Sequence, residues 1–160
     1  MNSIITASAP PEPHLDGREL TIGIIVARYN WTITSALLQC ALDELLLLNV
    51  AREKIHIVYV PGAYELATAA QAMLRGKSYD ALICFGCVMQ GETRHDVVVS
   101  DAAAHGIQRV ALDTHVPIVF GVMSAQNQAQ AEARIPRGRE CARSALELAQ
   151  TIKSLRKVNA

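Results

Sequence analysis

LTIGIIVA, the stretch Leu20–Ala27, is a short apolar run rich in β-branched residues, and it decides the fold class of this chain. Such a run predicts a strand that is buried on both faces. The next segment, Thr32–Asn49, places leucines and alanines at the spacing of a helix. A buried strand that leads directly into a helix predicts a βαβ unit with parallel strands.

The rest of the chain repeats this alternation of strand and helix. We expect strands at Ile55–Val60, Ala81–Val88 and Val116–Met123, and helices at Ala63–Arg75, Asp96–Leu112, Asn127–Arg134 and Arg139–Lys157. Pro136 and Gly138 are expected to separate the last two helices. The pattern predicts one α/β domain, residues 18–160, with a doubly wound sheet of about four parallel strands and helices on both faces.

The first 17 residues differ from this pattern. Ser8–Pro13 (SAPPEP) cannot continue a helix and lacks the N–H donors that a central strand needs. We therefore expect residues 1–17 to form a short extended arm ahead of the domain. Met1–Thr6 could add a strand to a neighbour's sheet.

Composition and charge exclude several classes of protein. The 160 residues carry a net charge of zero and no basic block longer than two residues, which argues against nucleic-acid binding. We find no secretory signal and no apolar stretch long enough for a membrane span. The four cysteines fit a reduced, cytoplasmic setting. A hydrophobic fraction of 51% suggests that some surface is hidden between subunits.

Polar and aromatic side chains follow every predicted strand. The four segments concerned are Arg28–Trp31, Pro61–Glu65, Met89–His95 and Ser124–Asn127. In an open parallel sheet, ligands bind beyond the carboxyl ends of the strands. The sequence therefore predicts a binding site at this edge.

Familiar sites on this architecture are missing. Ala27–Asn30 contains no glycine, which argues against a dinucleotide fold, and the chain has neither a Walker A loop nor an acidic pair after the first strand. Cys84 and Cys87 have redox or zinc spacing, but residues three apart on a strand face opposite sides. We interpret them as structural, and no metal site is expected.

His95 is the sharpest single candidate for catalysis. A histidine exchanges protons near neutral pH, and a strand-to-helix loop is a common catalytic position. The alternative is a surface histidine that caps a turn. The adjacent turn Gly91–Thr93 would expose backbone N–H groups at a helix start, where an anion binds, and Arg134 could supply a cation.

Taken together, these segments resemble the lumazine synthase family, in order, from about Leu20 to Lys157. The motifs that carry the resemblance are Arg28-Tyr29-Asn30, Val60-Pro61-Gly62-Ala63-Tyr64-Glu65, Gly91-Glu92-Thr93-x-His95, Val116–Val122 and Asn127-x-x-Gln130-Ala131-x-x-Arg134. The resemblance implies a flavodoxin-like fold. It also implies condensation of 5-amino-6-(D-ribitylamino)uracil with 3,4-dihydroxy-2-butanone 4-phosphate, the penultimate step of riboflavin synthesis, without cofactor or metal.

The resemblance assigns a role to each site residue. For the pyrimidine, Tyr29 stacks on the ring and Asn30 orients it, while contacts also come from Ala63, Tyr64, Glu65, Val88, Met89 and a neighbouring subunit's Phe120. For the phosphate, the ligands are Glu92, Thr93 and, across the subunit boundary, Arg134. His95 shuttles protons. Pentamers or multiples of them are implied.

Departures from the family pattern, and ordinary structural roles for some of these residues, leave alternatives open. Asp96 stands where the family usually has an aromatic residue, Gln90 where a basic residue is frequent, and the loop 135–140 is shortened. Tyr29 and Phe120 could instead be core aromatics, Glu65 could favour a helix start and Arg134 could be a solvated charge. The alternative function is a non-catalytic paralogue that binds flavin or lumazine, or forms a shell.

Overall fold

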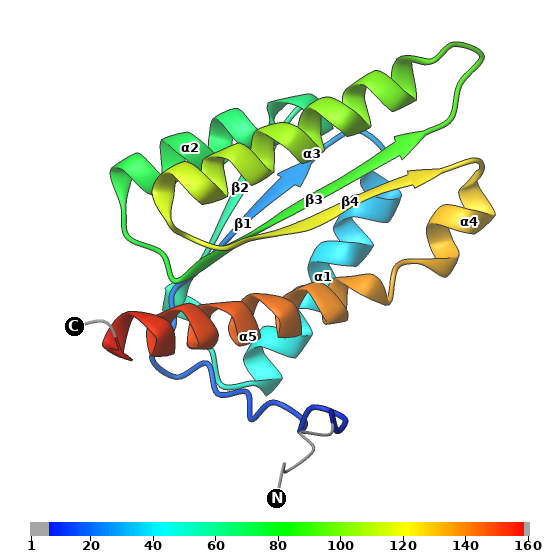
Figure 1. The fold of residues 1–160 in the computed structure, drawn as a ribbon. Coiled ribbons are helices and arrows are strands. Elements are labelled where there is room, and N and C mark those ends of the chain that lie inside the picture. The colour runs from blue at the N-terminus through cyan, green and yellow to red at the C-terminus, as the bar shows by residue number, and fades with distance from the viewer. Residues whose placement is uncertain (1–6, 159–160) are drawn as a thin grey trace, which may run out of the picture.

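The computed structural model describes residues 7–158, and its centre is one sheet of four parallel strands (Figure 1). The strand order is β2-β1-β3-β4. The strands are β1 (Ile22–Ala27), β2 (Ile55–Val60), β3 (Ala81–Met89) and β4 (Ile118–Ala125). This sheet confirms the α/β, flavodoxin-like class expected from the sequence.

Helices cover both faces of the sheet (Figure 1). Helices α1 (Trp31–Leu47) and α5 (Arg137–Val158) lie on one face, and α2 (Leu66–Gly76) and α3 (His95–Thr114) on the other. The short α4 (Gln128–Ala133) follows β4, and single 3₁₀ turns, η1 (Arg52–Lys54) and η2 (Ala63–Glu65), precede β2 and α2. The chain therefore has two apolar layers, one on each side of the sheet.

Strand β1 shows why the sheet needs both layers. All six of its residues are buried. Ile22, Ile24 and Val26 pack in the layer of α1 and α5. Ile25 and Ala27 pack in the layer of α2 and α3, because successive side chains of a strand point to opposite faces. Helices on one face alone would leave half of this strand in water.

Strand β4 begins two residues later than predicted, at Ile118 instead of Val116, and ends two residues later, at Ala125. Pro117 explains the late start. Its carbonyl accepts a hydrogen bond from the Leu82 amide at 2.9 Å, but proline has no N–H to donate to the sheet. Because β4 ends two residues later, its carboxyl end extends further toward the edge of the sheet where polar residues were predicted to gather.

Gly138 was expected to break a helix, and that prediction was wrong. It is buried inside α5, which already begins at Arg137. A Cβ at this position would collide with the carbonyl oxygen of Leu37 and lie 3.0 Å from Cβ of Cys40 on α1. The glycine therefore allows close packing of α1 and α5.

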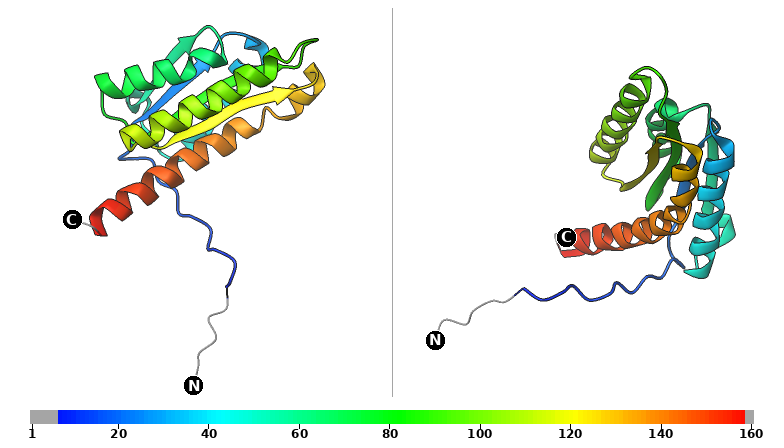
Figure 2. Two further views of the ribbon diagram at one scale, coloured as in Figure 1. Left: turned by 45° about the horizontal axis from the view of Figure 1, so that its top comes forward. Right: turned by 90° about the vertical axis from the view of Figure 1, so that its right-hand side faces the viewer.

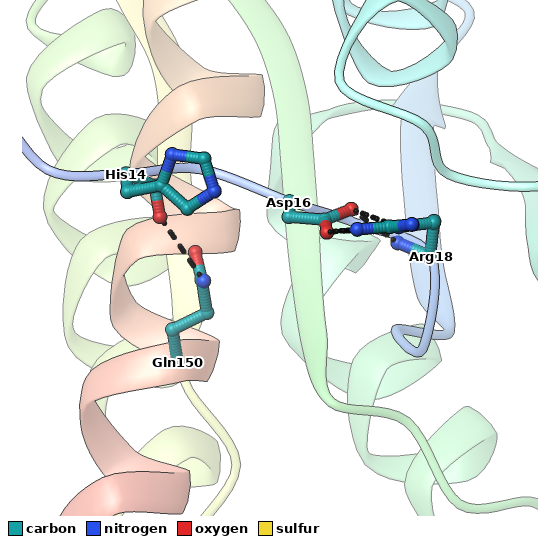
Figure 3. A network of polar contacts seen from close by, with 4 residues as sticks. All are labelled: His14, Asp16, Arg18 and Gln150. Carbon is teal, nitrogen blue, oxygen red and sulfur yellow. Dashed lines mark hydrogen bonds and ion pairs between the residues drawn. The ribbon is translucent and has the colours of Figure 1, made fainter.

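The segment ahead of β1 is tied to the domain from His14 onward (Figure 3). Gln150 of α5 donates through Nε2 to the His14 carbonyl at 3.2 Å, and the Arg18 guanidinium grips Asp16 at 2.5 Å. The Gly17 amide donates to the Leu48 carbonyl at 2.7 Å. Residues 7–13 are exposed and lie in no helix or strand, and the suggested strand Met1–Thr6 falls outside the described residues.

Two further expectations concern membranes and cysteines. In residues 7–158, no helix has both the length and the hydropathy of a membrane span. The four cysteines carry free thiols.

One buried carboxylate links the two helices of the α1 and α5 layer. Glu44 of α1 is only 5% exposed. It accepts from Nη1 of Arg143 at 2.8 Å and lies 3.3 Å from Nε of Arg139, both on α5. Because a carboxylate is costly to bury without partners, these two guanidinium groups hold the helices together at this point.

We expect Glu44→Ala to lower the free energy of unfolding by about 1.5–3 kcal/mol, the range for a hydrogen bond to a charged group. Urea denaturation measures the change. Asp43→Ala is the matched control on the same helix, because Asp43 is exposed and should shift stability by less than about 0.5 kcal/mol. Equal effects of the two variants would contradict the assigned role of Glu44.

Candidate functional site

The strands end at different heights along the carboxyl edge of the sheet. Strand β1 pairs with β3 only as far as Val26 and Phe85, whereas β3 pairs with β4 as far as Met89 and Ala125. The end of β3 thus projects beyond its last partner in β1. On the β1 side, this leaves space beside the backbone of β3.

A cleft of about 490 Å³ occupies this space. Its lining comes from the ends of β1 and β3, the turn after β2 and the first turns of α3: Tyr29, Asn30, Gly62, Ala63, Tyr64, Glu65, Cys87, Val88, Met89, His95, Val98 and Val99. A hollow of about 610 Å³ lies elsewhere, beside Leu112, Ile118 and Leu148. We place the site in the smaller cleft, because titratable, amide and aromatic groups converge there.

Asn30 closes one end of the cleft. Its backbone is left-handed, with φ of 58°, a conformation that asparagine tolerates better than most residues. Its side-chain Nδ2 donates to the Cys87 carbonyl at 2.7 Å, across the gap that β1 leaves beside β3. The hydrogen bond ties the end of β1 to β3 and leaves Oδ1 of Asn30 free to accept from a ligand.

The Tyr29 ring packs against Gly62. The Tyr29 side chain is 67% exposed, so it is not a core aromatic. A Cβ on Gly62 would come within 2.7 Å of the Tyr29 ring, so the ring rests against the bare backbone of the turn after β2. Tyr64 is 63% exposed and lines the same cleft. Two accessible aromatic rings therefore border the site.

Glu65 has a structural role as well as a place in the cleft. Its Oε2 accepts a hydrogen bond from the Gly62 amide at 2.9 Å, which braces the turn before α2. This is the helix-start role that the sequence left open. It leaves Oε1 available to a ligand.

His95 is the first residue of α3 and lines the cleft with Val98 and Val99. Residues three and four apart share one face of a helix, so the imidazole and the two valines form one wall. Asp96 is half-buried and does not line the cleft. At the start of a helix it complements the dipole.

The end of β3 supplies backbone and thiol groups. Because β-strand amides alternate in direction, the Met89 N–H and C=O point to the same side as the Cys87 carbonyl, toward the gap. Burial raises the pKa of the Cys87 thiol, and that of Cys84 to about 12, so both stay protonated near neutral pH. They pack in opposite layers, as the strand spacing predicted.

Four predicted residues do not line this chain's cleft: Glu92, Thr93, Phe120 and Arg134. Glu92 and Thr93 lie in the exposed turn before α3, where Thr93 Oγ1 accepts a long 3.4 Å contact from the His95 amide. Phe120 is 39% exposed on the edge strand β4, so it is not a core aromatic. Arg134 donates through Nη1 to the Ser124 carbonyl at 2.8 Å, at the end of β4.

The sequence missed part of the lining, namely Gly62, Cys87, Val98 and Val99. Val98 could have been predicted, because it lies three residues after His95 and therefore on the same face of the expected helix. Within residues 7–158, no group of three or more histidine, cysteine or acidic side chains is placed to hold a metal ion.

Comparison with known proteins supports one family. The family model for 6,7-dimethyl-8-ribityllumazine synthase matches residues 19–153. Relatives with that name include proteins of Polaromonas sp. and Paracidovorax citrulli, each 44% identical over 142 residues, with 88% of this chain and 92% of the relative covered. A relative from Laribacter hongkongensis is 43% identical over 146 residues, with 89% and 93% covered.

Two substitutions at Asn30 separate its backbone role from its side-chain role. Asn30→Ala should lower the free energy of unfolding by about 1.5–3 kcal/mol, since it loses the bond to Cys87 and strains the left-handed backbone. Asn30→Gly keeps the backbone relaxed and should cost only the bond, about 0.5–1.5 kcal/mol. Urea denaturation of the two variants measures both losses of unfolding free energy. If glycine were as destabilising as alanine, the left-handed backbone would not matter.

Proposed function

The chain belongs to the 6,7-dimethyl-8-ribityllumazine synthase family, and from that membership we infer that it condenses 5-amino-6-(D-ribitylamino)uracil with 3,4-dihydroxy-2-butanone 4-phosphate. Inorganic phosphate and water leave as the lumazine ring closes. The relatives named above all carry the synthase name, so the non-catalytic alternative has no support from them.

The observation that carries the proposal is the cleft itself. It brings His95, two accessible tyrosines and the end of β3, whose β1 side is unpaired, into one space of about 490 Å³. A flat pyrimidinedione with a polar ribityl chain needs this combination of an aromatic face, backbone hydrogen bonds and a carboxylate. The composition of the cleft therefore supports a site for the pyrimidine substrate.

On the pyrimidine side, we propose that Tyr29 stacks on the ring while Asn30 orients it through Oδ1. Met89 offers its backbone groups to the ring edge, and Val88, whose backbone groups point toward β4, contributes its side chain to the lining. Ala63 and Tyr64 hold the ring and ribityl chain, and Glu65 accepts from ribityl hydroxyls through Oε1. Each of these side chains lines the cleft, which supports the assignment.

The phosphate side uses two copies of the chain. We propose that backbone N–H groups of Glu92 and Thr93 bind phosphate at the start of α3, where the helix dipole favours an anion. Arg134 of a neighbouring subunit adds the cation, and that subunit's Phe120 closes the cleft. Both residues lie outside the cleft of their own chain, on or beside β4, and this position favours a role toward a neighbour.

The main task of the protein in this reaction is to position the two substrates. The pyrimidine amine attacks the ketone of the sugar phosphate, and water leaves to form the Schiff base. Phosphate is then eliminated, and the ribitylamino nitrogen attacks the remaining carbonyl, so that the ring closes with loss of a second water. His95 lines the cleft close to the phosphate-binding turn, so we assign to it the proton transfers of Schiff-base formation and phosphate elimination. Holding the two substrates side by side supplies much of the remaining acceleration.

Incubation of the purified chain with both substrates tests the proposed reaction. We expect lumazine absorbance to appear together with one inorganic phosphate for each lumazine formed. A chain that binds the pyrimidine but releases no phosphate above the uncatalysed rate would support the non-catalytic alternative.

We also propose the setting and the organisation of the protein. Four free cysteines support a reducing, cytoplasmic location.

The chain divides into an arm, residues 1–17, and a domain, residues 18–160. Exposed apolar side chains such as Leu112 (62% exposed) and Leu148 (42% exposed) favour self-association.

A closed ring lets every chain complete the site of its neighbour. Following the family pattern, we propose that a ring of five is the smallest stable assembly. Light scattering at micromolar concentration measures the mass. A monomer under those conditions would contradict both the pentamer and the shared site.

His95→Ala should lower turnover about 10²–10⁴-fold, the usual contribution of general acid–base catalysis. Affinity for the pyrimidine should change little, because stacking and backbone contacts remain. Steady-state kinetics and pyrimidine titration measure the two effects separately, and unchanged turnover would remove His95 from the mechanism.

Asp96→Phe should lower the KM for the butanone phosphate more than the KM for the pyrimidine. The Asp96 carboxylate lies in the first turn of α3, where its charge opposes a bound phosphate. Salt should narrow the difference between the two KM shifts, because partly exposed charges are screened over about 8–10 Å. Asp96→Asn is the matched control that removes charge without adding a ring. Equal shifts of the two KM values would refute the electrostatic account.

A further inference from the structure

A pair of hydroxyl groups joins α3 to β4, outside the cleft of their own chain. Oγ of Ser100, on α3, lies 2.8 Å from Oγ of Ser124, on β4. Val122 packs in the layer of α2 and α3, so the Ser124 side chain, two residues later, points to the same face. Strand β4 is at the edge of the sheet and pairs only with β3. The hydroxyl contact therefore holds the end of this strand from a second side.

The backbone of Ser124 holds Arg134. The Gln90 amide donates to the Ala125 carbonyl at 2.8 Å, so that carbonyl faces β3. Because backbone groups alternate in direction along a strand, the Ser124 carbonyl points the other way, to the open edge of the sheet. There it accepts from Nη1 of Arg134 at 2.8 Å. Ser124 thus contacts α3 through its side chain and Arg134 through its backbone.

Arg134 is fixed at its base as well as at its tip. It follows α4, which lies at the carboxyl end of β4 (Figure 2). Two hydrogen bonds secure the start of α4: the Gln126 amide donates to Oε1 of Gln130 at 2.9 Å, and Nε2 of Gln130 donates to Oε1 of Gln126 at 3.2 Å. Among residues 7–158, no carboxylate forms an ion pair with Arg134. The exposed guanidinium keeps its charge and its remaining N–H donors for an external anion.

Ser100 shares a helix with His95 but faces away from it. Successive helix residues turn by about 100°, so a separation of five residues places Ser100 about 140° around α3 from His95. His95 lines the cleft of its own chain, and Ser100 does not. Helix α3 instead runs alongside β4 on the side of Ser100 (Figure 2). One helix therefore carries the proton-transfer residue of its own site and a support for Arg134, which is assigned to the site of a neighbour.

We propose that Ser100 is a positioning residue for the phosphate site of the neighbouring subunit. Its hydroxyl fixes Ser124, and the Ser124 carbonyl holds the Arg134 guanidinium ready for the butanone phosphate. An arginine that is held before binding loses less rotamer freedom when the anion arrives, which raises the affinity. This role rests on the proposed function. It gives the polar segment after β4 a task outside the cleft of its own chain.

Removal of either hydroxyl in the full-length protein should affect the two substrates unequally. Ser100→Ala and Ser124→Ala should each raise the KM for the butanone phosphate about two- to tenfold, the effect of one neutral hydrogen bond. The KM for the pyrimidine should stay unchanged. Ser124→Thr keeps the hydroxyl and suits a strand, so both of its KM values should match those of the unmodified protein.

Ser35→Ala is the matched control, because it removes a serine hydroxyl from α1, in the other layer. It should change neither KM. Equal shifts of the two KM values in Ser100→Ala would overturn the positioning role. The same loss in Ser124→Thr as in Ser124→Ala would overturn it as well.

A double-mutant cycle shows whether Ser100 acts through Arg134. The backbone N–H groups proposed to bind phosphate remain in Arg134→Ala protein, so its KM for the butanone phosphate can be measured at higher substrate concentration. In that background, Ser100→Ala should raise this KM no further. An equal rise with and without Arg134 would contradict the proposed route.

Mixed rings show in which subunit's site Ser100 acts. Ser100→Ala and His95→Ala chains are refolded together in equal amounts, so only the Ser100→Ala chains supply an active His95. About half of these active sites have a neighbour with an unmodified Ser100, and they should regain the KM of the unmodified protein. A raised KM at every active site would place the effect of Ser100 in its own chain and refute the proposal.

The positioning role and the proposed function can fail separately. Lumazine formation with the same KM values in Ser100→Ala as in the unmodified protein would refute the positioning role and leave the synthase intact. If the unmodified protein forms no lumazine, the synthase proposal fails, and titration with inorganic phosphate decides the role of Ser100. Weaker phosphate binding in Ser100→Ala would then support the role, and equal binding would refute it.

Discussion

The site depends on unequal strand lengths at the carboxyl edge of the sheet. Strand β3 continues beyond its pairing with β1, so the backbone near Met89 faces a gap where a neighbouring strand would otherwise lie. Asn30 spans that gap by its bond to the Cys87 carbonyl, and the remaining space is the cleft. A longer β1 would fill it, because sheet hydrogen bonds would replace those open to a ligand.

The layers around the sheet explain why this edge carries the chemistry. Both faces are covered by helices, so a ligand can reach backbone groups only where strands end. The turn after β2 and the start of α3 then bring Glu65 and His95 to the same opening. Glu65 also braces its own turn through Gly62, so one side chain serves both the fold and the proposed site.

Much of this arrangement is predictable from the sequence, because buried strands and amphipathic helices have distinct periods. Ile55–Val60 has the predicted bounds, and residues that follow β1, β2 and β3 do meet in one cleft, whereas those that follow β4 do not line it. Contacts between residues that are far apart in the sequence could not be predicted, because they depend on how the strands and helices pack in three dimensions. The bond from Asn30 to Cys87 joins residues 57 apart. Gly138 resembled a helix breaker because its reason, the close approach of α1, lies in another element.

The central claim is that two copies complete one site, and subunit complementation tests it most directly. His95→Ala and Arg134→Ala chains are prepared separately, unfolded, mixed in equal amounts and refolded together. In random mixed rings, roughly a quarter of the sites combine an intact His95 with a neighbour's intact Arg134. The account predicts lumazine formation at about that fraction of the unmodified rate. Activity no greater than the mean of the two separate variants would contradict a site shared between chains.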